Sequence, residues 1–369
     1  MSKTPLSKLQ SQAKTILTST ESAIRKLAKS VGARRYDNYH KKEALKAVAG
    51  IETYNGARLT PALKKRADDY AIQVLGRREY APWLYVYALV CGAFKEGWIP
   101  DNFFGRVVWP QVNNGLGELT DHKSLTKIVL RTEALPDIAY RLNGVTYDRN
   151  FTPIRPSDLS DLAGGGATPL FLKKDGSSQG RGVAKIAAGD ITEDTLAAIG
   201  NCVIQRAIEQ HAFFDEIMSG SVATLRITTV KNGAGEIDWR AAYLRLGRKD
   251  TAWVQSGNSV RVAIVDRDGE LDPFGYTEAW RRWPAHPDTG FSFAKKRIPG
   301  FREATATCVA LHRSFPHFAV IGWDVAIDRN DRVRLIEWNA AHCDIKFSEA
   351  ATGPCFLGLG WERLREAAV

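Results

Sequence analysis

The chain has 369 residues, 44% hydrophobic and 25% charged, which is ordinary for a soluble globular protein and sufficient for two or three domains. Its longest apolar run, residues 81–94, is too short to span a bilayer and predicts a buried helix. The N-terminus has no apolar signal-peptide core, and the five cysteines are widely separated without CxxC spacing. This pattern argues against a disulfide framework and predicts a cytoplasmic protein.

The basic charge is concentrated near the N-terminus. The net charge is +10, and residues 1–50 contain eight lysines and three arginines against three acidic residues. The rest of the chain is therefore nearly balanced in charge. This distribution argues against a nucleic-acid groove running through the fold, so we expect no nucleic-acid partner.

Residues 1–112 are expected to form a helical region. Apolar residues recur at helical spacing from Leu6 to Val31 with lysines between them, which predicts a basic amphipathic helix. That helix either packs on its own domain with a solvated lysine face, or docks to an anionic membrane, a protein partner or a second copy of the chain. Thr60 and Pro61 provide the start of another helix, and Pro82 begins a third.

A glycine-rich hairpin is predicted in the next segment. Residues 170–173 and 183–186 have strand composition, and the loop between them contains three glycines and two serines. The backbone N–H groups of such a loop can close over phosphates, and Lys173 at the strand end can reach the same phosphates. The alternative is a flexible hairpin tip that binds nothing. The pattern is neither a P-loop nor a Rossmann fingerprint.

Two arginines and a histidine stand out in the segments that follow. Residues 221–230 form a predicted strand with Arg226 inside it, and residues 241–246 form another that carries Arg245. An arginine within an apolar strand either sits in a buried ion pair or faces an anion in a cleft. His286 lies in a predicted loop, where it is either structural or positions a substrate.

The hairpin of residues 321–339 brings polar ligands together. Asp324 stands at the start of its first predicted strand, and Glu337 and Asn339 stand at the end of the second. In an antiparallel hairpin these ends lie side by side, about 5 Å apart, with Glu337 and Asn339 on the same face. Two carboxylates and an amide oxygen suit Mg²⁺. The alternative is a solvated hairpin end, which the apolar neighbours disfavour because a buried Glu beside an Asp needs a cation or a raised pKa.

In this order the motifs resemble those of the ATP-grasp superfamily, and most closely its sugar-transfer-associated group, which is related to the α-L-glutamate ligases. The resemblance rests on F-L-K-K-D-G-S-S-Q-G-R-G-V, T-L-R-I-T-T-V, H-P-D-T-G with the later I-P-G-F, and I-G-W-D-V-A-I with L-I-E-W-N. The spacing from Asp324 to Glu337, with Asn339 following, agrees with the metal-binding pattern of the D-alanine ligases. The resemblance covers about residues 115–350 and leaves out the N-terminal helices.

The resemblance implies an α+β fold, the ATP-grasp fold, in which two α+β subdomains with antiparallel sheets clasp ATP. In this chain the subdomains would be residues 113–208, with the glycine-rich loop, and residues 209–369, with the metal site. Residues 1–112 would precede them as a helical domain.

The implied cofactors are ATP and one or two Mg²⁺ ions. The implied phosphate-binding residues are Lys123 (or Lys127), Lys173, Ser177, Ser178, Gln179, Gly180 and Gly182. The implied contacts of adenine and ribose are Gln205, Ile208 and Asp215 (or Glu209). The implied Mg²⁺ ligands are Asp324, Glu337 and Asn339.

The implied reaction joins a carboxylate to an amine through an acyl phosphate, and the group's name suggests polysaccharide or glycoconjugate synthesis. Arg226, and after it Arg245, would stabilise the oxyanion, and His286 would position a substrate or move a proton. The expected partners are small-molecule or glycan carboxylates and amines. Two alternatives remain: a phosphotransferase that acts on a sugar or another hydroxyl, and a nucleotide-binding scaffold without catalysis.

Overall fold

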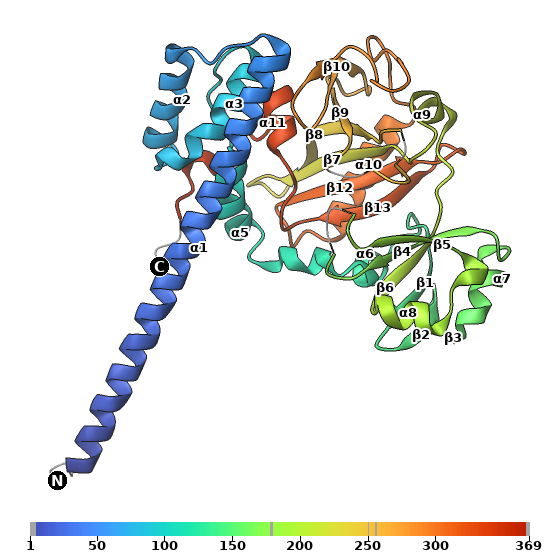
Figure 1. Ribbon diagram of the computed structural model, residues 1–369, viewed down its shortest axis with the longest axis horizontal. Helices are drawn as coiled ribbons and strands as arrows, with labels where there is room; N and C mark the ends of the chain where they lie inside the picture. Colours follow the sequence, from blue (N-terminus) through green and yellow to red (C-terminus); the bar gives the residue numbers. More distant parts are fainter. Residues whose placement is uncertain (1–4, 178–179, 250, 255–256, 367–369) are drawn as a thin grey trace.

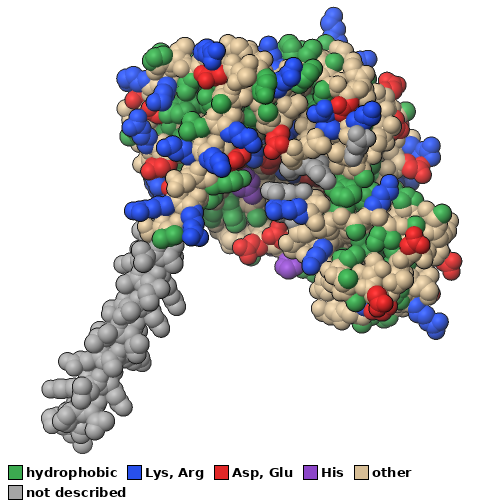
Figure 2. All heavy atoms as spheres, viewed as in Figure 1, with side chains coloured by type: hydrophobic (Ala, Val, Ile, Leu, Met, Phe, Trp, Pro, Cys, Tyr) green, Lys and Arg blue, Asp and Glu red, His purple; other side chains and the backbone are tan. Residues whose placement is uncertain are grey.

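The computed structural model describes residues 5–177, 180–249, 251–254 and 257–366, and of residues 5–29 it describes the backbone alone. The fold consists of a helical region, a six-stranded sheet and a seven-stranded sheet (Figure 1). Among the described residues, no helix is both long and apolar enough to cross a membrane. Basic and acidic side chains are interspersed over the face shown in Figure 2.

The helical region begins with one long helix, α1, which extends from the rest of the fold in Figure 1. The side chains of the predicted amphipathic stretch before Ser30 lie outside the described residues. The predicted start at Thr60 is confirmed, because its hydroxyl accepts a hydrogen bond of 3.2 Å from the Leu63 N–H and Pro61 occupies the first turn. The helices of the region are α1 (Pro5–Asn55), α2 (Pro61–Gln73), α3 (Ala81–Cys91), α4 (Asp101–Phe103) and α5 (Trp109–Val112).

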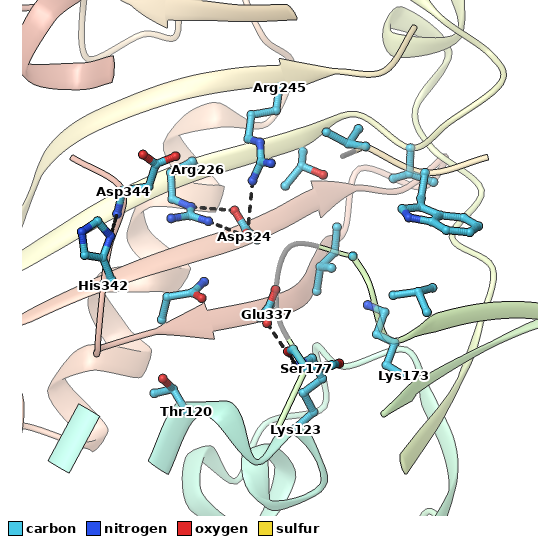
Figure 3. A pocket seen from close by; sticks show the side chains of 18 of the residues that line it. Thr120, Lys123, Lys173, Ser177, Arg226, Arg245, Asp324, Glu337, His342 and Asp344 are labelled. Carbon is cyan, nitrogen blue, oxygen red and sulfur yellow. Dashed lines mark hydrogen bonds and ion pairs between the residues drawn. The ribbon is translucent and has the colours of Figure 1, made fainter. Parts of the chain in front are cut away.

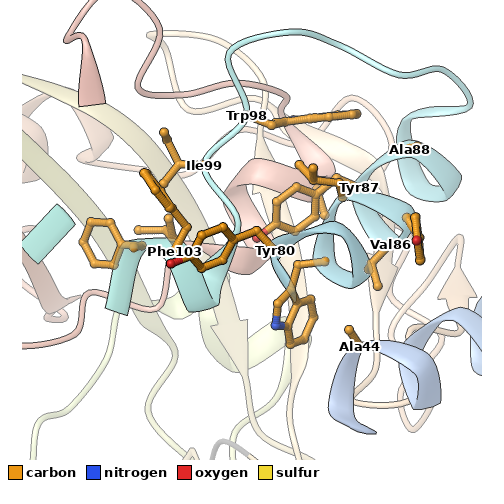
Figure 4. Close-up of a cluster of buried hydrophobic side chains, with 14 of the residues drawn as sticks. Ala44, Tyr80, Val86, Tyr87, Ala88, Trp98, Ile99 and Phe103 are labelled. Carbon is orange, nitrogen blue, oxygen red and sulfur yellow. The ribbon is translucent and has the colours of Figure 1, made fainter. Parts of the chain in front are cut away.

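The predicted buried helix is α3, which is apolar all round and enclosed on every side. Its core includes Tyr80, Tyr87, Trp98 and Phe103 (Figure 4). The same cluster continues into one face of the seven-stranded sheet and into the C-terminal helix α11 (Lys346–Ala351). The helical region therefore shares its core with the second sheet instead of having one of its own, and the boundaries at residues 112 and 208 remain predictions.

The six-stranded sheet is antiparallel throughout, with strand order β3-β2-β1-β6-β4-β5. The predicted glycine-rich hairpin is confirmed as β4 and β5. The helices α7 (Leu159–Ala163) and α8 (Glu193–Ile199) accompany this sheet, and α6 (Thr126–Leu130) leads into it. Its strands are β1 (Asp137–Leu142), β2 (Val145–Asp148), β3 (Pro153–Ile154), β4 (Pro169–Lys174), β5 (Val183–Ala187) and β6 (Cys202–Arg206).

The seven-stranded sheet has the order β11-β10-β9-β8-β7-β12-β13, and α9 (Ala212–Ile217) lies on the connection from the smaller sheet. The helix α10 (Phe301–Ser314) packs on one face and the helical region covers part of the other. Two of its central strands are buried along nearly their whole length, polar residues included. The strands are β7 (Thr224–Lys231), β8 (Ile237–Leu246), β9 (Val260–Ile264), β10 (Leu271–Tyr276), β11 (Arg282–Trp283), β12 (Val320–Ile327) and β13 (Val333–Asn339).

Candidate functional site

A cavity of about 550 Å³ opens where the two sheets and the helical region meet. Figure 3 shows its lining, with Lys123 and Lys173 on one side and Arg226, Arg245 and Asp324 on the other. Most of the residues predicted from the sequence lie in it together. They are Lys123, Lys173, Ser177, Gly180, Gln205, Ile208, Arg226, Arg245, Asp324, Glu337 and Asn339.

The hairpin of β12 and β13 places the predicted metal ligands side by side. Asp324 is paired with Glu337 and Gly322 with Asn339, and the register shifts after Asp324. The prediction that the hairpin is central holds for β12, which is buried along its whole length between β7 and β13. It is wrong for β13, which is the edge strand of the sheet and only partly buried. The prediction that Asp324 starts its strand is wrong, because Val320 already pairs with Val230 of β7 and extends the strand backwards.

The side chain of Asn113 holds the two strands of this hairpin together. Its side-chain amide donates to the backbone oxygens of Val320, at 2.9 Å, and Ala340, at 2.7 Å. Its side-chain oxygen accepts from the Ala319 N–H at 2.8 Å. One buried asparagine thus holds the start of β12 against the end of β13, so the ligands on the two strands keep their relative position.

Arg226 and Asp324 form a buried ion pair between β7 and β12. The guanidinium donates from Nε to Oδ1 at 2.7 Å and from NH2 to Oδ2 at 2.8 Å. Burial alone would lower the pKa of Arg226, but the charge of Asp324 raises it well above its usual value. Arg245 NH1 lies 3.9 Å from the same carboxylate. Of the two alternatives for an arginine within an apolar strand, the buried ion pair is therefore the one that the structure shows.

Lys123 connects the glycine-rich loop to the hairpin. Its ammonium donates to the Ser177 carbonyl at 2.5 Å and lies 3.4 Å from Glu337 Oε1. The alternative, Lys127, donates to the Arg149 carbonyl at 2.8 Å and does not line the cavity. Of the two predicted lysines, Lys123 is thus the one that lines the cavity.

Lys173 and Gln205 share a buried carboxylate that sequence reasoning missed. Gln205 Nε2 donates to Asp137 Oδ1 at 2.7 Å, and the Tyr140 hydroxyl donates to Oδ2 at 2.9 Å. Burial lowers the pKa of Lys173, and the charges of Glu337 and Asp137 oppose that shift. Asp137 opens an unremarkable strand, so nothing in the local sequence distinguishes it from a solvated residue.

The donor set fits Mg²⁺. Glu337 and Asn339 supply a carboxylate and an amide oxygen, and the amide nitrogen of Asn339 points to the Gly322 carbonyl at 3.4 Å. Each oxygen of Asp324 keeps a second lone pair after Arg226 has bound, so Asp324 can hold a cation and the guanidinium together. Among the described residues no group of three or more His, Cys, Asp or Glu could hold a metal, so the two carboxylates and one amide are the candidate set.

The structure does not bring His286 to the cavity. Its Nε2 lies 3.0 Å from the Gly247 carbonyl, and the Asp288 N–H donates to its Nδ1 at 3.4 Å. Burial lowers its pKa, so the ring is neutral at pH 7. Both of these contacts agree with the structural alternative for this loop histidine.

The remaining predicted residues that the structure describes do not line the cavity. Gly182 does not line it, and a side chain there would collide with Ser177, so the glycine lets the loop fold back on itself. Asp215 and Glu209 line an adjoining cavity that shares Ile208 with the first. Ser178 and Gln179 lie outside the described residues.

The far end of the cavity has a lining that sequence reasoning did not assign. Tyr39, His40 and Asp101 enter it from the helical region. Arg261 and the segment after Asn339 complete it, with His342, Asp344 and Lys346. A signal did exist in the chain, because these three polar residues alternate directly after the Glu-x-Asn pair.

Asp344 is held ionised at this end. Lys346 Nζ lies 3.0 Å from its Oδ1, and the Tyr243 hydroxyl donates to its Oδ2 at 3.2 Å. Burial by itself would raise the pKa of Asp344, but Lys346 and Arg261 hold it well below its usual value. The same segment is tied to β7, because Arg226 NH1 donates to the Cys343 carbonyl at 2.8 Å.

Several solved structures are similar to this chain. The biotin carboxylase domain of 2-oxoglutarate carboxylase from Hydrogenobacter thermophilus, in complex with MgADP, ADP and bicarbonate, is 12% identical, with a TM-score of 0.42, and the match covers 82% of this chain and 66% of that one. An L-amino acid ligase from Bacillus licheniformis is 10% identical, with a TM-score of 0.40, and the match covers 69% of this chain and 50% of that one. N5-carboxyaminoimidazole synthase from Aspergillus clavatus, in complex with ADP and 5-aminoimidazole ribonucleotide, is 12% identical, with a TM-score of 0.33. That match covers 60% of this chain and 44% of the other. This chain thus spans roughly half to two thirds of those chains.

No curated protein matches the chain. Residues 180–359 match the model of the family described as sugar-transfer associated ATP-grasp. That region contains Arg226, Asp324, Glu337 and Asn339, and the two antiparallel sheets enclose the cavity that these residues line. The matched region belongs to the ATP-grasp superfamily, and the chain has that superfamily's α+β fold, preceded by a helical region.

Proposed function

We propose that the chain is an ATP-dependent ligase that joins a carboxylate to an amine through an acyl phosphate and releases ADP and phosphate. The observation that supports this most directly is the continuity of one cavity. Phosphate-binding lysines, oxygen ligands for Mg²⁺ and a group of arginines follow one another along the same walls. ATP with bound Mg²⁺ would supply the phosphoryl group that activates the carboxylate.

The nucleotide end is the part near Phe171, Gln205 and Ile208. Asp137 fixes the amide of Gln205, so its oxygen is held in one orientation for the edge of a base. Lys123 and Lys173 present two positive charges beside the Ser177 loop, which suits a polyphosphate. For the ribose, Asp215 and Glu209 remain the two candidates, because both line the adjoining cavity.

The metal position would be between the nucleotide end and the arginines. Glu337 would be the principal ligand, with Asn339 and the free lone pairs of Asp324 beside it. Lys123 lies 3.4 Å from Glu337 Oε1, so an ion and the lysine would share that carboxylate or the lysine would turn towards a phosphate. One or two ions would bind at this position.

The acceptor end would lie beyond Asp324, where Arg226, Arg245 and Arg261 line the walls. An acceptor carboxylate needs fixed positive charge both for binding and for the oxyanion that forms when an amine attacks. Because Arg226 is committed to Asp324, Arg245 becomes our first choice for the oxyanion and Arg226 the residue that orients Asp324. His286 is left out, since it does not line the cavity.

The test is ADP release in the presence of Mg²⁺, with uronic acids and amino acids as carboxylates and amino sugars and amino acids as amines. The family's description, which refers to sugar transfer, supports that choice of panel. We expect ADP release only when a carboxylate and an amine are both present. Release that needs a hydroxyl acceptor and no amine would show a phosphotransferase instead, and tight ATP binding without any release would show a scaffold.

The matched variants are Glu337→Gln and Glu303→Gln. Glu337→Gln removes the main carboxylate of the proposed metal position and should abolish ADP release. Glu303 is an exposed carboxylate in the first turn of α10, and its removal should change nothing. Equal activity of the two variants would contradict the proposal.

A further inference from the structure

Asp101 is a buried carboxylate that the helical region contributes to the acceptor end of the cavity. It is the first residue of α4, is only 2% exposed, and lines the cavity together with His342 and Lys346. Its Oδ1 is buried and accepts no hydrogen bond from any described residue. A buried carboxylate oxygen without a donor costs free energy, so a donor is expected to reach it in the working protein.

The neighbours of Asp101 leave its charge only partly balanced. His40 Nδ1 lies 3.7 Å away, but that nitrogen already accepts a hydrogen bond of 3.2 Å from Trp83 Nε1. Burial lowers the pKa of His40 to about 4, so this ring is neutral at pH 7. His40 therefore brings neither a proton nor a charge to Asp101.

The two other neighbours do not supply the missing hydrogen bond. Lys346 Nζ lies 3.9 Å from Asp101 but 3.0 Å from Asp344, so its charge is mainly balanced by Asp344. His342 Nε2 lies 3.5 Å from Asp101 Oδ1, while the Asp344 N–H donates to the Nδ1 of the same ring at 3.4 Å. None of these contacts is a hydrogen bond to Oδ1, which leaves this oxygen for a ligand.

Building on the ligase function proposed above, we propose that Asp101 receives the ammonium group of the amine substrate. A primary amine is protonated at neutral pH and carries three N–H donors. It would therefore donate the missing hydrogen bond to Oδ1 and balance the negative charge of Asp101. The carboxylate substrate needs the arginines, so the two walls of the acceptor end would divide the two substrates between them. The helical region is then the part of the chain that selects the amine.

The test compares a charged and an uncharged nucleophile. Glucosamine, glycine and lysine serve as the charged primary amines, and hydroxylamine, which is uncharged at neutral pH, serves as the neutral one. Asp101→Asn keeps the shape of the side chain and removes its charge. We expect the KM for the charged amine to rise about tenfold or more, with the KM for ATP and the turnover with hydroxylamine unchanged.

Two further variants keep the test decisive. Asp69→Asn changes a carboxylate on α2 that pairs with Lys65, and it should behave as the wild type. His342→Asn alters the partly exposed neighbour and leaves Asp101 itself in place. It should raise the KM for the charged amine by a smaller factor than Asp101→Asn does. It replaces Asp101→Asn if that variant fails to fold.

An unchanged KM for the amine, or an equal loss with hydroxylamine in both variants, would overturn the assignment of Asp101 while leaving the ligase intact. Absence of ADP release by the wild type with every carboxylate and with both kinds of nucleophile is a different result. It would overturn the ligase function and the role of Asp101 together.

Discussion

Arg226 of β7 and Asp324 of β12 stand opposite each other in register and are joined by two hydrogen bonds, of 2.7 and 2.8 Å. Both side chains are almost completely buried. The pair therefore couples the stability of the sheet to the position of a proposed Mg²⁺ ligand.

Removing one partner of this pair should destabilise the protein strongly. We expect Arg226→Ala to lower the free energy of unfolding by about 3–5 kcal/mol, because Asp324 is left as a buried charge without its partner. Urea unfolding of Arg226→Ala, Asp324→Ala and the double variant measures the coupling, and the double variant should cost less than the sum. The exposed pair of Arg267 and Asp238 is the control, with an expected coupling of about 0–1 kcal/mol. Additive losses at the buried pair would contradict the prediction.

Glu337→Gln should weaken Mg²⁺ binding more than nucleotide binding. The amide cannot supply the negative charge of the carboxylate, whereas Lys123 and Lys173 remain in place for the phosphates. Calorimetric titration of the ATP-loaded protein with Mg²⁺ should show that the variant binds Mg²⁺ at least about tenfold more weakly than the wild type. The affinity for ATP in the absence of Mg²⁺ should change little. The same titration reports how many ions bind. Identical Mg²⁺ affinities for wild type and variant would exclude Glu337 as a ligand.

Asp137→Ala should impair ATP binding indirectly, through the two residues that Asp137 supports. Asp137 holds the Gln205 amide through a 2.7 Å hydrogen bond, and its charge favours protonated Lys173. We expect the dissociation constant for ATP to rise about tenfold, since Gln205 loses its fixed orientation and Lys173 loses a stabilising charge. Binding of a fluorescent ATP analogue measures this, with Asp161→Ala as an exposed control. A dissociation constant equal to that of the control would show that Asp137 has no part in binding.

Glu349 should make stability depend on pH. Its Oε2 accepts from the Ile99 N–H and its Oε1 from the Cys355 N–H, both at 2.7 Å, and burial raises its pKa from 4.5 to about 8. Between those values the unfolded chain is ionised while the folded protein keeps the proton. Stability is therefore greatest below the unfolded pKa and is lost as the pH rises towards 8, with a slope of up to about 1.4 kcal/mol per pH unit.

Urea unfolding at pH 5, 6, 7 and 8 measures that slope. In Glu349→Gln the carboxyl proton is absent from both states, so the contribution of this residue disappears while one acceptor oxygen remains. We expect the decline between pH 5 and 8 to be shallower in the variant. Parallel pH profiles for the two proteins would show that Glu349 does not titrate in this range.

The sequence predicted well the features that depend on near neighbours in the chain. The glycine-rich hairpin and the pairing of Asp324 with Glu337 follow from strand composition and turn residues, because hairpin partners are close in sequence. The start at Thr60 follows from a side chain that caps a backbone only three residues away. The prediction that Asp324 starts its strand was wrong because β12 begins earlier, where it pairs with β7, a strand that is distant in sequence.

Other features depend on contacts between distant segments. The sequence left open whether Arg226 faces an anion or forms an ion pair, and Asp324, almost a hundred residues later, decides between them. It placed His286 among the catalytic residues, whereas packing against Gly247 puts its ring away from the cavity.

By itself, then, the sequence predicted the order of the hairpins, the residues that we propose to face phosphates and a cation, and the ATP-grasp resemblance that the family match supports. Only the tertiary structure decided that the helical region shares a core with the second sheet and sends Asp101 into the cavity. The physical reason is that hairpin registers and helix caps are fixed by local hydrogen bonds. The partner of a buried charge is fixed by how distant apolar surfaces pack, which no local pattern encodes.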